Sequence, residues 1–280
     1  MKIKFLMILI TLFAITGIIS FGKLTVVTTI PPLGYMVSTI GGSAVDVSVL
    51  EKPGDNPHNF NLTPQQALFI SRSEVFVDLG LEEDAWIGDR VRSINPSLKV
   101  IDATKSLSQF LIGESGAYNP HVWLDVKLYE MMVINVYSMI VKLDPADQPI
   151  FANNFSKFIL SLDQLNDRIS KELEPIRGKP FVAQHPAWDY FARAYRLGME
   201  YSLENDAGQP IGPKDYQSII EAMRKYNIKS IISDPVTSSK LANQLASQTG
   251  AKIVKINPIF NFNYFDLMDE IVNGFLEALK

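Results

Sequence analysis

Short apolar segments alternate with longer segments of helical periodicity along most of the chain. Residues 24–30 are rich in β-branched side chains and predict a buried strand, whereas residues 33–40 have the three- or four-residue spacing of a helix. The same order repeats through residues 45–103, where Thr63-Pro64-Gln65-Gln66 predicts a helix start with a capping box. Because strands that alternate with helices are typical of parallel sheets, this half predicts a sheet covered by helices.

One segment, residues 146–173, interrupts the alternation. It contains no glycine, and apolar side chains recur every three or four residues, at Phe151, Phe155, Phe158, Leu162, Leu165 and Ile169. A helix of about 27 residues would be roughly 40 Å long, enough to run the height of two domains. The strand and helix order restarts at residue 181 and continues to the closing helix at 264–279.

The predicted fold is therefore α/β, with two similar parallel-sheet lobes joined by one long rigid helix. We expect an N-terminal lobe over residues 23–143, the linking helix within 144–177, and a C-terminal lobe over 178–280. The two halves share an order of elements but no repeat in their sequences.

The first 22 residues predict an export signal. Lys2 and Lys4 precede an apolar run over residues 5–19, and Ser20-Phe21-Gly22 provides a small-x-small cleavage site. We expect export to the periplasm with Lys23 as the first mature residue; an uncleaved membrane anchor is the alternative. The chain has no cysteine, so no lipid-anchor cysteine is expected.

Composition narrows the function classes. An apolar content of 47% and a charged content of 20% describe a globular protein with a full core. A net charge of −4 and the absence of a basic run argue against a nucleic-acid partner. The lack of cysteine excludes disulfides, thiolate metal ligands and a cysteine nucleophile.

Histidine is scarce, and each of the three histidines, His58, His121 and His185, has a proline beside it in or next to a predicted loop. Ligands of α/β sheets bind at loops after the carboxyl ends of strands, so all three imidazoles can face one cleft between the lobes. A single histidine beside proline is more often solvated or hydrogen-bonded than a ligand. Three histidines at the carboxyl edges of the two sheets predict a nitrogen-rich site suited to zinc.

The segment Asn119-Pro120-His121-Val122-Trp123-Leu124-Asp125, with Asn56-Pro57-His58 and Gln184-His185-Pro186-Ala187-Trp188, resembles the metal-binding periplasmic proteins of zinc and manganese ABC importers, the cluster A-I solute-binding family. The resemblance covers essentially the whole mature chain. It includes the predicted long linking helix, which is similar to the family's rigid interdomain helix. It implies that the three histidines are metal ligands. It also implies zinc as the bound ion, because manganese-binding relatives tend to have a carboxylate at the position of His185.

Two departures from the family pattern concern the site. Asn257, in Ile256-Asn257-Pro258-Ile259, occupies the position where the family usually has an aspartate as fourth ligand. Asn257 and the nearby Asp234 are the candidates for the fourth position or for hydrogen bonds that support the ligands; for Asp234 a helix cap or such an acceptor is the commoner role. The predicted loop at 113–119 also lacks the histidine-rich insertion of many zinc-specific relatives.

The resemblance implies high-affinity zinc binding and delivery to an ABC-type permease in the inner membrane, by a monomer that is not an enzyme. Manganese or another divalent metal is the alternative cargo. A zinc-dependent hydrolase is a remote alternative, since three histidines and an open position also build a catalytic zinc site. The chain contains no His-Glu-x-x-His or Gly-x-Ser-x-Gly segment to favour it.

Overall fold

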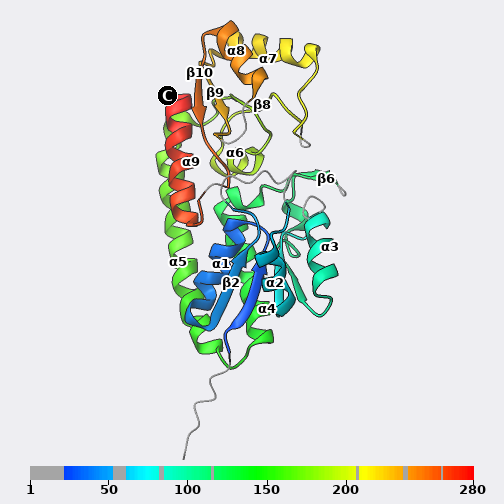
Figure 1. Cartoon of the computed structure of the whole chain (residues 1–280). Coiled ribbons are helices and arrows are strands. Elements are labelled where there is room, and N and C mark those ends of the chain that lie inside the picture. Colours follow the sequence, from blue (N-terminus) through cyan, green and yellow to red (C-terminus); the bar gives the residue numbers. More distant parts are fainter. Residues whose placement is uncertain are drawn as a thin grey trace, which may run out of the picture.

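The computed structural model describes residues 22–52, 61–81, 85–114, 117–205, 208–235, 239–259 and 261–280. Within these ranges, two four-stranded parallel sheets form two lobes, with strand orders β2-β1-β3-β4 and β10-β9-β7-β8 (Figure 1). The predicted α/β class with two parallel-sheet lobes is confirmed.

Helices cover both faces of the N-terminal sheet. Its strands are β1 (Leu24–Thr28), β2 (Val45–Val49), β3 (Val75–Asp78) and β4 (Lys99–Asp102), and its helices are α1 (Pro31–Gly41), α2 (Pro64–Arg72), α3 (Ala85–Ile94) and α4 (Val126–Leu143). A compact cluster under α2 and α3 includes Val27, Ile70, Phe76 and Val91. The opposite face, under α1 and α4, belongs to a larger core that continues into the second lobe.

The C-terminal lobe repeats this arrangement. Its strands are β7 (Phe181–Ala183), β8 (Glu200–Ser202), β9 (Ser230–Ser233) and β10 (Lys252–Lys255), and its helices are α6 (Asp189–Tyr195), α7 (Pro213–Tyr226), α8 (Lys240–Thr249) and α9 (Tyr264–Leu279). Helices α7 and α8 cover one face, where Ile219, Met223 and Leu245 pack on Val182 and Ile231. The other face joins the larger core through α9.

Helix α5 (Gln148–Glu172) links the lobes as a single 25-residue element. At a rise of 1.5 Å per residue it is about 38 Å long. Its buried side chains are five of the six predicted from the spacing, Phe151, Phe158, Leu162, Leu165 and Ile169, whereas Phe155 is partly buried. Helix α9 runs alongside it past the junction of the lobes (Figure 1), and Arg168 pairs with Asp269 at 2.5 Å between the two helices. The lobe boundaries after residues 143 and 177 stay a prediction.

The predicted capping box at the start of α2 is present. The Thr63 hydroxyl accepts from the Gln66 backbone N–H at 3.2 Å, and Gln66 Oε1 accepts from the Thr63 N–H at 2.8 Å. The Gln66 amide also donates to the Leu50 carbonyl at 2.6 Å, which joins the helix to the end of β2. Local sequence therefore fixes the start of α2.

One local prediction was wrong in detail. Residues 113–119 are not a plain loop, because β5 (Gly113–Glu114) and β6 (Ala117–Tyr118) form an antiparallel ribbon. The ribbon continues with a hydrogen bond from the Asn119 N–H to the Ile112 carbonyl at 2.9 Å. Pairing between these two short strands decides the structure here, which periodicity alone does not encode.

Four short helical turns complete the described elements. Turn η1 (Gly42–Ala44) follows α1, η4 (Ser108–Phe110) follows β4, η5 (Val122–Leu124) precedes α4, and η6 (Glu174–Ile176) follows α5. In the described ranges, no helix is both long and apolar enough to cross a bilayer. The predicted signal, residues 1–22, lies outside the described residues except for Gly22.

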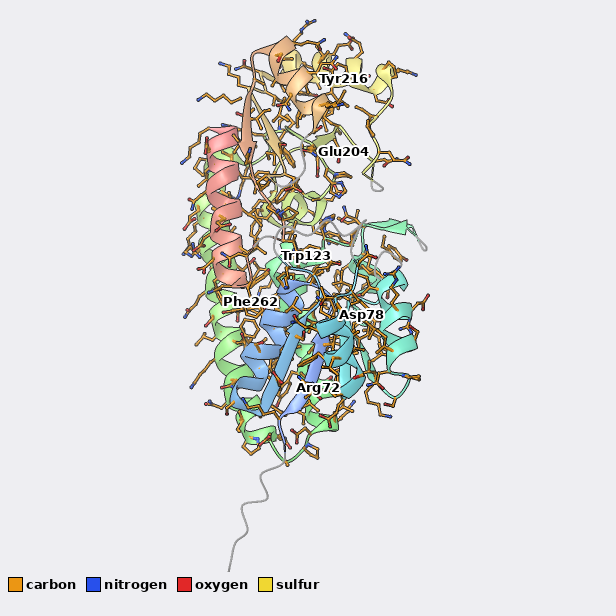
Figure 2. All side chains as sticks on the ribbon, in the orientation of Figure 1. Arg72, Asp78, Trp123, Glu204, Tyr216 and Phe262 are labelled. Atoms are coloured by element: carbon orange, nitrogen blue, oxygen red, sulfur yellow. The ribbon has the colours of Figure 1, made fainter. Side chains whose placement is uncertain are left out.

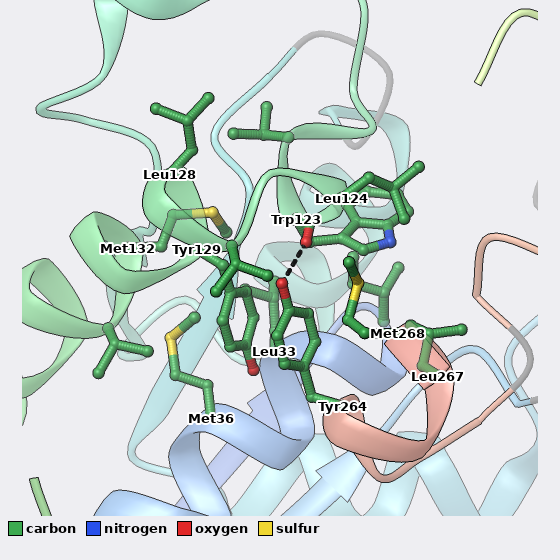
Figure 3. Packing of buried hydrophobic residues seen from close by; sticks show 14 of the residues in the cluster. Leu33, Met36, Trp123, Leu124, Leu128, Tyr129, Met132, Tyr264, Leu267 and Met268 are labelled. Carbon is green, nitrogen blue, oxygen red and sulfur yellow. Dashed lines mark hydrogen bonds between the residues drawn. The ribbon is translucent and has the colours of Figure 1, made fainter. Parts of the chain in front are cut away.

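A stack of aromatic rings joins the lobes. Tyr264, the first residue of α9, stacks on Tyr129 of α4 with ring centroids 3.7 Å apart and planes 8° apart (Figure 3). The Tyr264 hydroxyl donates to the Trp123 carbonyl at 2.7 Å, and the Tyr129 hydroxyl donates to the Pro32 carbonyl at 2.7 Å. Burial raises the pKa of both phenols well above the ordinary value, so both remain neutral donors.

Removing the Tyr264 side chain should destabilise the whole chain. We expect Tyr264→Ala to lower the free energy of unfolding by about 3–5 kcal/mol, because a fully buried ring and its stacking partner are lost. Tyr264→Phe keeps the ring and removes only the donor to the Trp123 carbonyl, so about 1–3 kcal/mol is expected. Urea unfolding followed by fluorescence measures both.

Tyr226→Phe is the matched control, because Tyr226 is 45% exposed. Its unfolding free energy should change by less than about 0.5 kcal/mol. Equal effects of Tyr264→Phe and Tyr226→Phe would contradict the role given to the buried hydrogen bond.

Candidate metal centre

His121 lies between two fixed backbone segments. The ribbon strand β6 ends just before Asn119, and His121 is followed directly by turn η5. After the turn, the Asp125 carboxylate accepts from the backbone N–H groups of Lys127 and Leu128 at 2.9 and 3.2 Å, which caps α4. The backbone that carries His121 is therefore held on both sides.

The Asn119 side chain orients the His121 ring. Asn119 Oδ1 accepts from the His121 backbone N–H at 3.0 Å and lies 2.8 Å from His121 Nδ1. Because an amide oxygen only accepts, this contact requires the hydrogen on Nδ1 and leaves the Nε2 lone pair available. Burial lowers the pKa of His121 well below its ordinary value, and neighbouring His185 lowers it further. The ring is a neutral imidazole, the form that binds metal.

His185 approaches His121 from the other lobe. It follows β7, and its ring centroid lies 5.4 Å from that of His121 with the planes 69° apart. The His185 side chain is 27% exposed, and its Nδ1 lies 3.8 Å from Glu204 Oε2. Two of the three predicted ligands are thus brought together at the junction of the lobes.

Asn119 also connects the lobes. Its amide nitrogen donates to the Pro186 carbonyl at 3.1 Å and to Asp189 Oδ2 at 3.3 Å, both beside His185 in the C-terminal lobe. The Tyr190 hydroxyl donates to the Asn119 carbonyl at 3.0 Å. The residue that orients one imidazole is therefore bonded to the segment that carries the other.

Asn257 and Asp234 are hydrogen-bonded to each other in the C-terminal lobe. The Asn257 amide donates to Asp234 Oδ1 at 3.2 Å, and Asn257 Oδ1 accepts from the Ile259 N–H at 2.8 Å. The next residue, Pro258, accepts from the Trp123 indole N–H at 2.8 Å, and Trp123 lies where the lobes meet (Figure 2). The Asn257 oxygen already accepts one hydrogen bond, so any role as fourth ligand stays a prediction.

The third predicted ligand, His58, lies outside the described residues. Among the residues that the structure describes, no three His, Asp or Glu side chains form a group able to hold a metal ion. The described part of the candidate centre is therefore the pair His121 and His185, two imidazoles from facing lobes. Imidazole nitrogen donors of this kind fit zinc.

Three polar residues around the pair were not predicted as part of the site, namely Asn119, Gln184 and Glu204. Asn119 lies inside the Asn-Pro-His motif, and its spacing of two residues from His121 was the available signal. Glu204 has no such signal, because it reaches His185 only through the pairing of β8 with β7.

The comparison with protein families agrees with this geometry. The profile described as "ZnuA: Zinc-uptake complex component A periplasmic" matches residues 26–278. The chain belongs to this family. The match spans both lobes and the linking helix, and it includes all three histidines.

Individual members of the ZnuA family and its structural neighbours are distant in sequence. The high-affinity zinc uptake system protein ZnuA of Bacillus subtilis is 26% identical, over 92% of this chain and 88% of that protein. A crystal structure of ZnuA superposes with a TM-score of 0.85 at 24% identity, covering 92% of this chain and all of that one. The Mn²⁺ complex of FpvC from Pseudomonas aeruginosa superposes with a TM-score of 0.79 at 22% identity, covering 92% of this chain and 98% of FpvC. The fold is thus shared by FpvC with Mn²⁺ and by a ZnuA deletion mutant solved with zinc bound, which superposes with a TM-score of 0.84.

Substitution of Asn119 should weaken the junction of the lobes. Asn119→Ala removes the amide's bonds to both lobes, so we expect the free energy of unfolding to fall by about 1–3 kcal/mol. Asn119→Asp keeps the acceptor for His121 but loses both donors and adds a carboxylate beside Asp189. We expect it to be less stable than Asn119→Ala, as measured by urea unfolding of the metal-free protein.

Asn153→Ala is the control, because Asn153 is exposed on α5. It should leave stability within about 0.5 kcal/mol of the original. An Asn119→Asp protein as stable as the original would show that the bonds to Pro186 and Asp189 contribute nothing to the junction.

Proposed function

We propose that this protein binds zinc between its lobes and delivers it to an ABC-type permease for uptake. The observation that carries the proposal is the pair of imidazoles, His121 and His185, facing each other across the junction. Membership of a family described as a zinc-uptake component supports the transport role. Binding of cargo, not chemical conversion, is the activity proposed.

The proposed ligands are His58, His121 and His185, with the fourth position open to water, Asn257 or Asp234. Nitrogen donors suit zinc, whereas carboxylate and carbonyl oxygens suit manganese. Relatives of this fold bind either metal, so the fold does not decide between them. The histidine at position 185 favours zinc, and manganese is the second candidate.

The protein's own residues prepare this site before metal arrives. Asn119 holds the Nδ1–H form of His121 and so presents Nε2. Burial keeps His121 neutral, which avoids the cost of removing a proton when metal binds. Helix α5 and the Tyr264–Tyr129 stack tie both lobes together, so closure would be a small tilt rather than a wide hinge motion.

The rest of the proposal concerns the cellular setting. We propose a monomer located in the periplasm, with the permease in the inner membrane as its partner. The family description as periplasmic and the predicted export signal support the location. The family description as a component of a zinc-uptake complex supports the permease as partner.

Metal analysis of the purified protein tests the proposal directly. We expect one zinc per chain and a preference for zinc over manganese in competitive titration. His121→Ala should lower zinc affinity by more than the roughly 10–100-fold typical of a residue that merely supports a ligand. Asn153→Ala should bind zinc normally. A preference for manganese would overturn the metal assignment, and unchanged zinc binding by His121→Ala would overturn the site.

Zinc affinity should fall as the pH decreases below about 6.5, the ordinary imidazole value, because protons compete for the same nitrogen lone pairs. Since burial lowers the pKa of His121, its ring stays neutral at the start of that range. Zinc then displaces protons from at most two of the three proposed histidine ligands. Each displaced proton lowers the zinc affinity by at most tenfold per pH unit, so the affinity should fall no more than about a hundredfold per unit just below pH 6.5. Competitive titrations between pH 5.5 and 8, corrected for the chelator, measure the slope. A thousandfold loss per unit would contradict a buried neutral His121.

A further inference from the structure

One carboxylate faces the second histidine of the pair. Glu204 follows β8, and its Oε2 lies 3.8 Å from His185 Nδ1. The Glu204 side chain is only 16% exposed. Figure 2 shows Glu204 in the C-terminal lobe, on the part of it nearer to the junction than Tyr216. No motif in the sequence marks this residue.

The Glu204 carboxylate is held from within the lobe. Its Oε1 accepts from the Gln184 side-chain amide at 3.1 Å, and Gln184 Oε1 in turn accepts from the Ser233 hydroxyl at 2.6 Å. The backbone beside it is fixed as well, since the Leu203 N–H donates to the Ala183 carbonyl at 3.0 Å. Glu204 is thus a partly buried acid whose position is set by the ends of three strands.

Each of the two histidines has an acceptor on the Nδ1 side of its ring, at different distances. His121 Nδ1 lies 2.8 Å from the Asn119 amide oxygen, a hydrogen bond, whereas His185 Nδ1 lies 3.8 Å from the Glu204 carboxylate, beyond hydrogen-bond length. An acceptor at Nδ1 fixes the hydrogen there, leaves Nε2 as the donor nitrogen, and makes that nitrogen more basic. At 3.8 Å the Glu204 carboxylate acts through its charge, which favours the hydrogen on the nearer ring nitrogen of His185.

We propose that Glu204 is the positioning residue of His185, a role that rests on the proposed function for its use in metal binding. Its charge favours the Nδ1–H form of His185 and leaves Nε2 as the nitrogen that would bind metal. It also provides negative charge near the site, which the neutral side chain at Asn257 does not. A divalent cation held by neutral imidazoles is stabilised by such a charge.

The first measurement uses the metal-free protein. Nitrogen-15 NMR at pH 8 should show His185 with its hydrogen on Nδ1, the signal being assigned by its loss in His185→Gln. Glu204→Leu removes the acceptor at similar size, and the Nε2–H form should then increase. Glu204→Gln keeps an acceptor without charge and should retain most of the Nδ1–H form. An unchanged His185 tautomer in Glu204→Leu would overturn the proposal.

The second measurement is metal affinity. Glu204→Leu should weaken zinc binding by about 10–100-fold, and Glu204→Gln by less. Glu221→Leu is the matched control, because Glu221 is exposed on α7, and it should leave affinity unchanged. Urea unfolding of each variant confirms that it is folded.

The visible spectrum of the cobalt-substituted protein separates positioning from direct binding. The coordination number of the cobalt ion, read from this spectrum, should be the same in the original protein and in Glu204→Gln. A lost oxygen ligand in Glu204→Gln would show that Glu204 binds the metal itself and would overturn the positioning role. Absence of zinc binding in the original protein would overturn the proposed function alone, since the tautomer measurement needs no metal.

Discussion

A single carboxamide, that of Asn119, connects the orientation of a histidine ring to the contact between the lobes. Its oxygen accepts from His121, while its nitrogen donates to Pro186 and Asp189 across the junction. Both ends of the amide fix its orientation. A flipped amide would place its N–H groups against the N–H groups of His121, and its oxygen against the oxygens of Pro186 and Asp189. The contacts with the C-terminal lobe therefore support the orientation in which the Asn119 amide presents its oxygen to His121.

The remaining structure keeps the lobes in that arrangement. Helix α5 passes both lobes without interruption, and the larger hydrophobic core extends from the first sheet to α9. The Trp123 segment is bonded to the C-terminal lobe twice, through Pro258 and through Tyr264. A protein built in this way resists wide opening, so the small displacements that remain act on the hydrogen bonds around Asn119.

Much of the architecture could be predicted from the sequence because it depends on local patterns. The strand and helix alternation, the Thr63 capping box and the apolar spacing of α5 are all set by neighbours within a few residues. The closing helix over Tyr264–Leu279 was predicted with its exact bounds for the same reason. The His121 and His185 contact was predicted in outline, from the rule that loops after parallel strands share one edge.

What could not be predicted depends on contacts between distant segments. The β5–β6 ribbon pairs two residues with two others, too few to produce a periodic signal. Glu204 lies beside His185 only because β8 pairs with β7, and one acidic residue among 30 in the chain carries no mark of that pairing. The hydrogen bond of Asn257 to Asp234 likewise requires β9 and β10 to be adjacent.

The position of α9 has a consequence for biosynthesis. Tyr264 at its start packs in the first lobe, against Tyr129 and beneath Trp123, although every strand of the second lobe precedes it in the chain (Figure 3). The N-terminal lobe thus lacks a central part of its core until translation has passed α9. The first lobe therefore cannot reach full stability during synthesis until the strands of the second lobe have also been made.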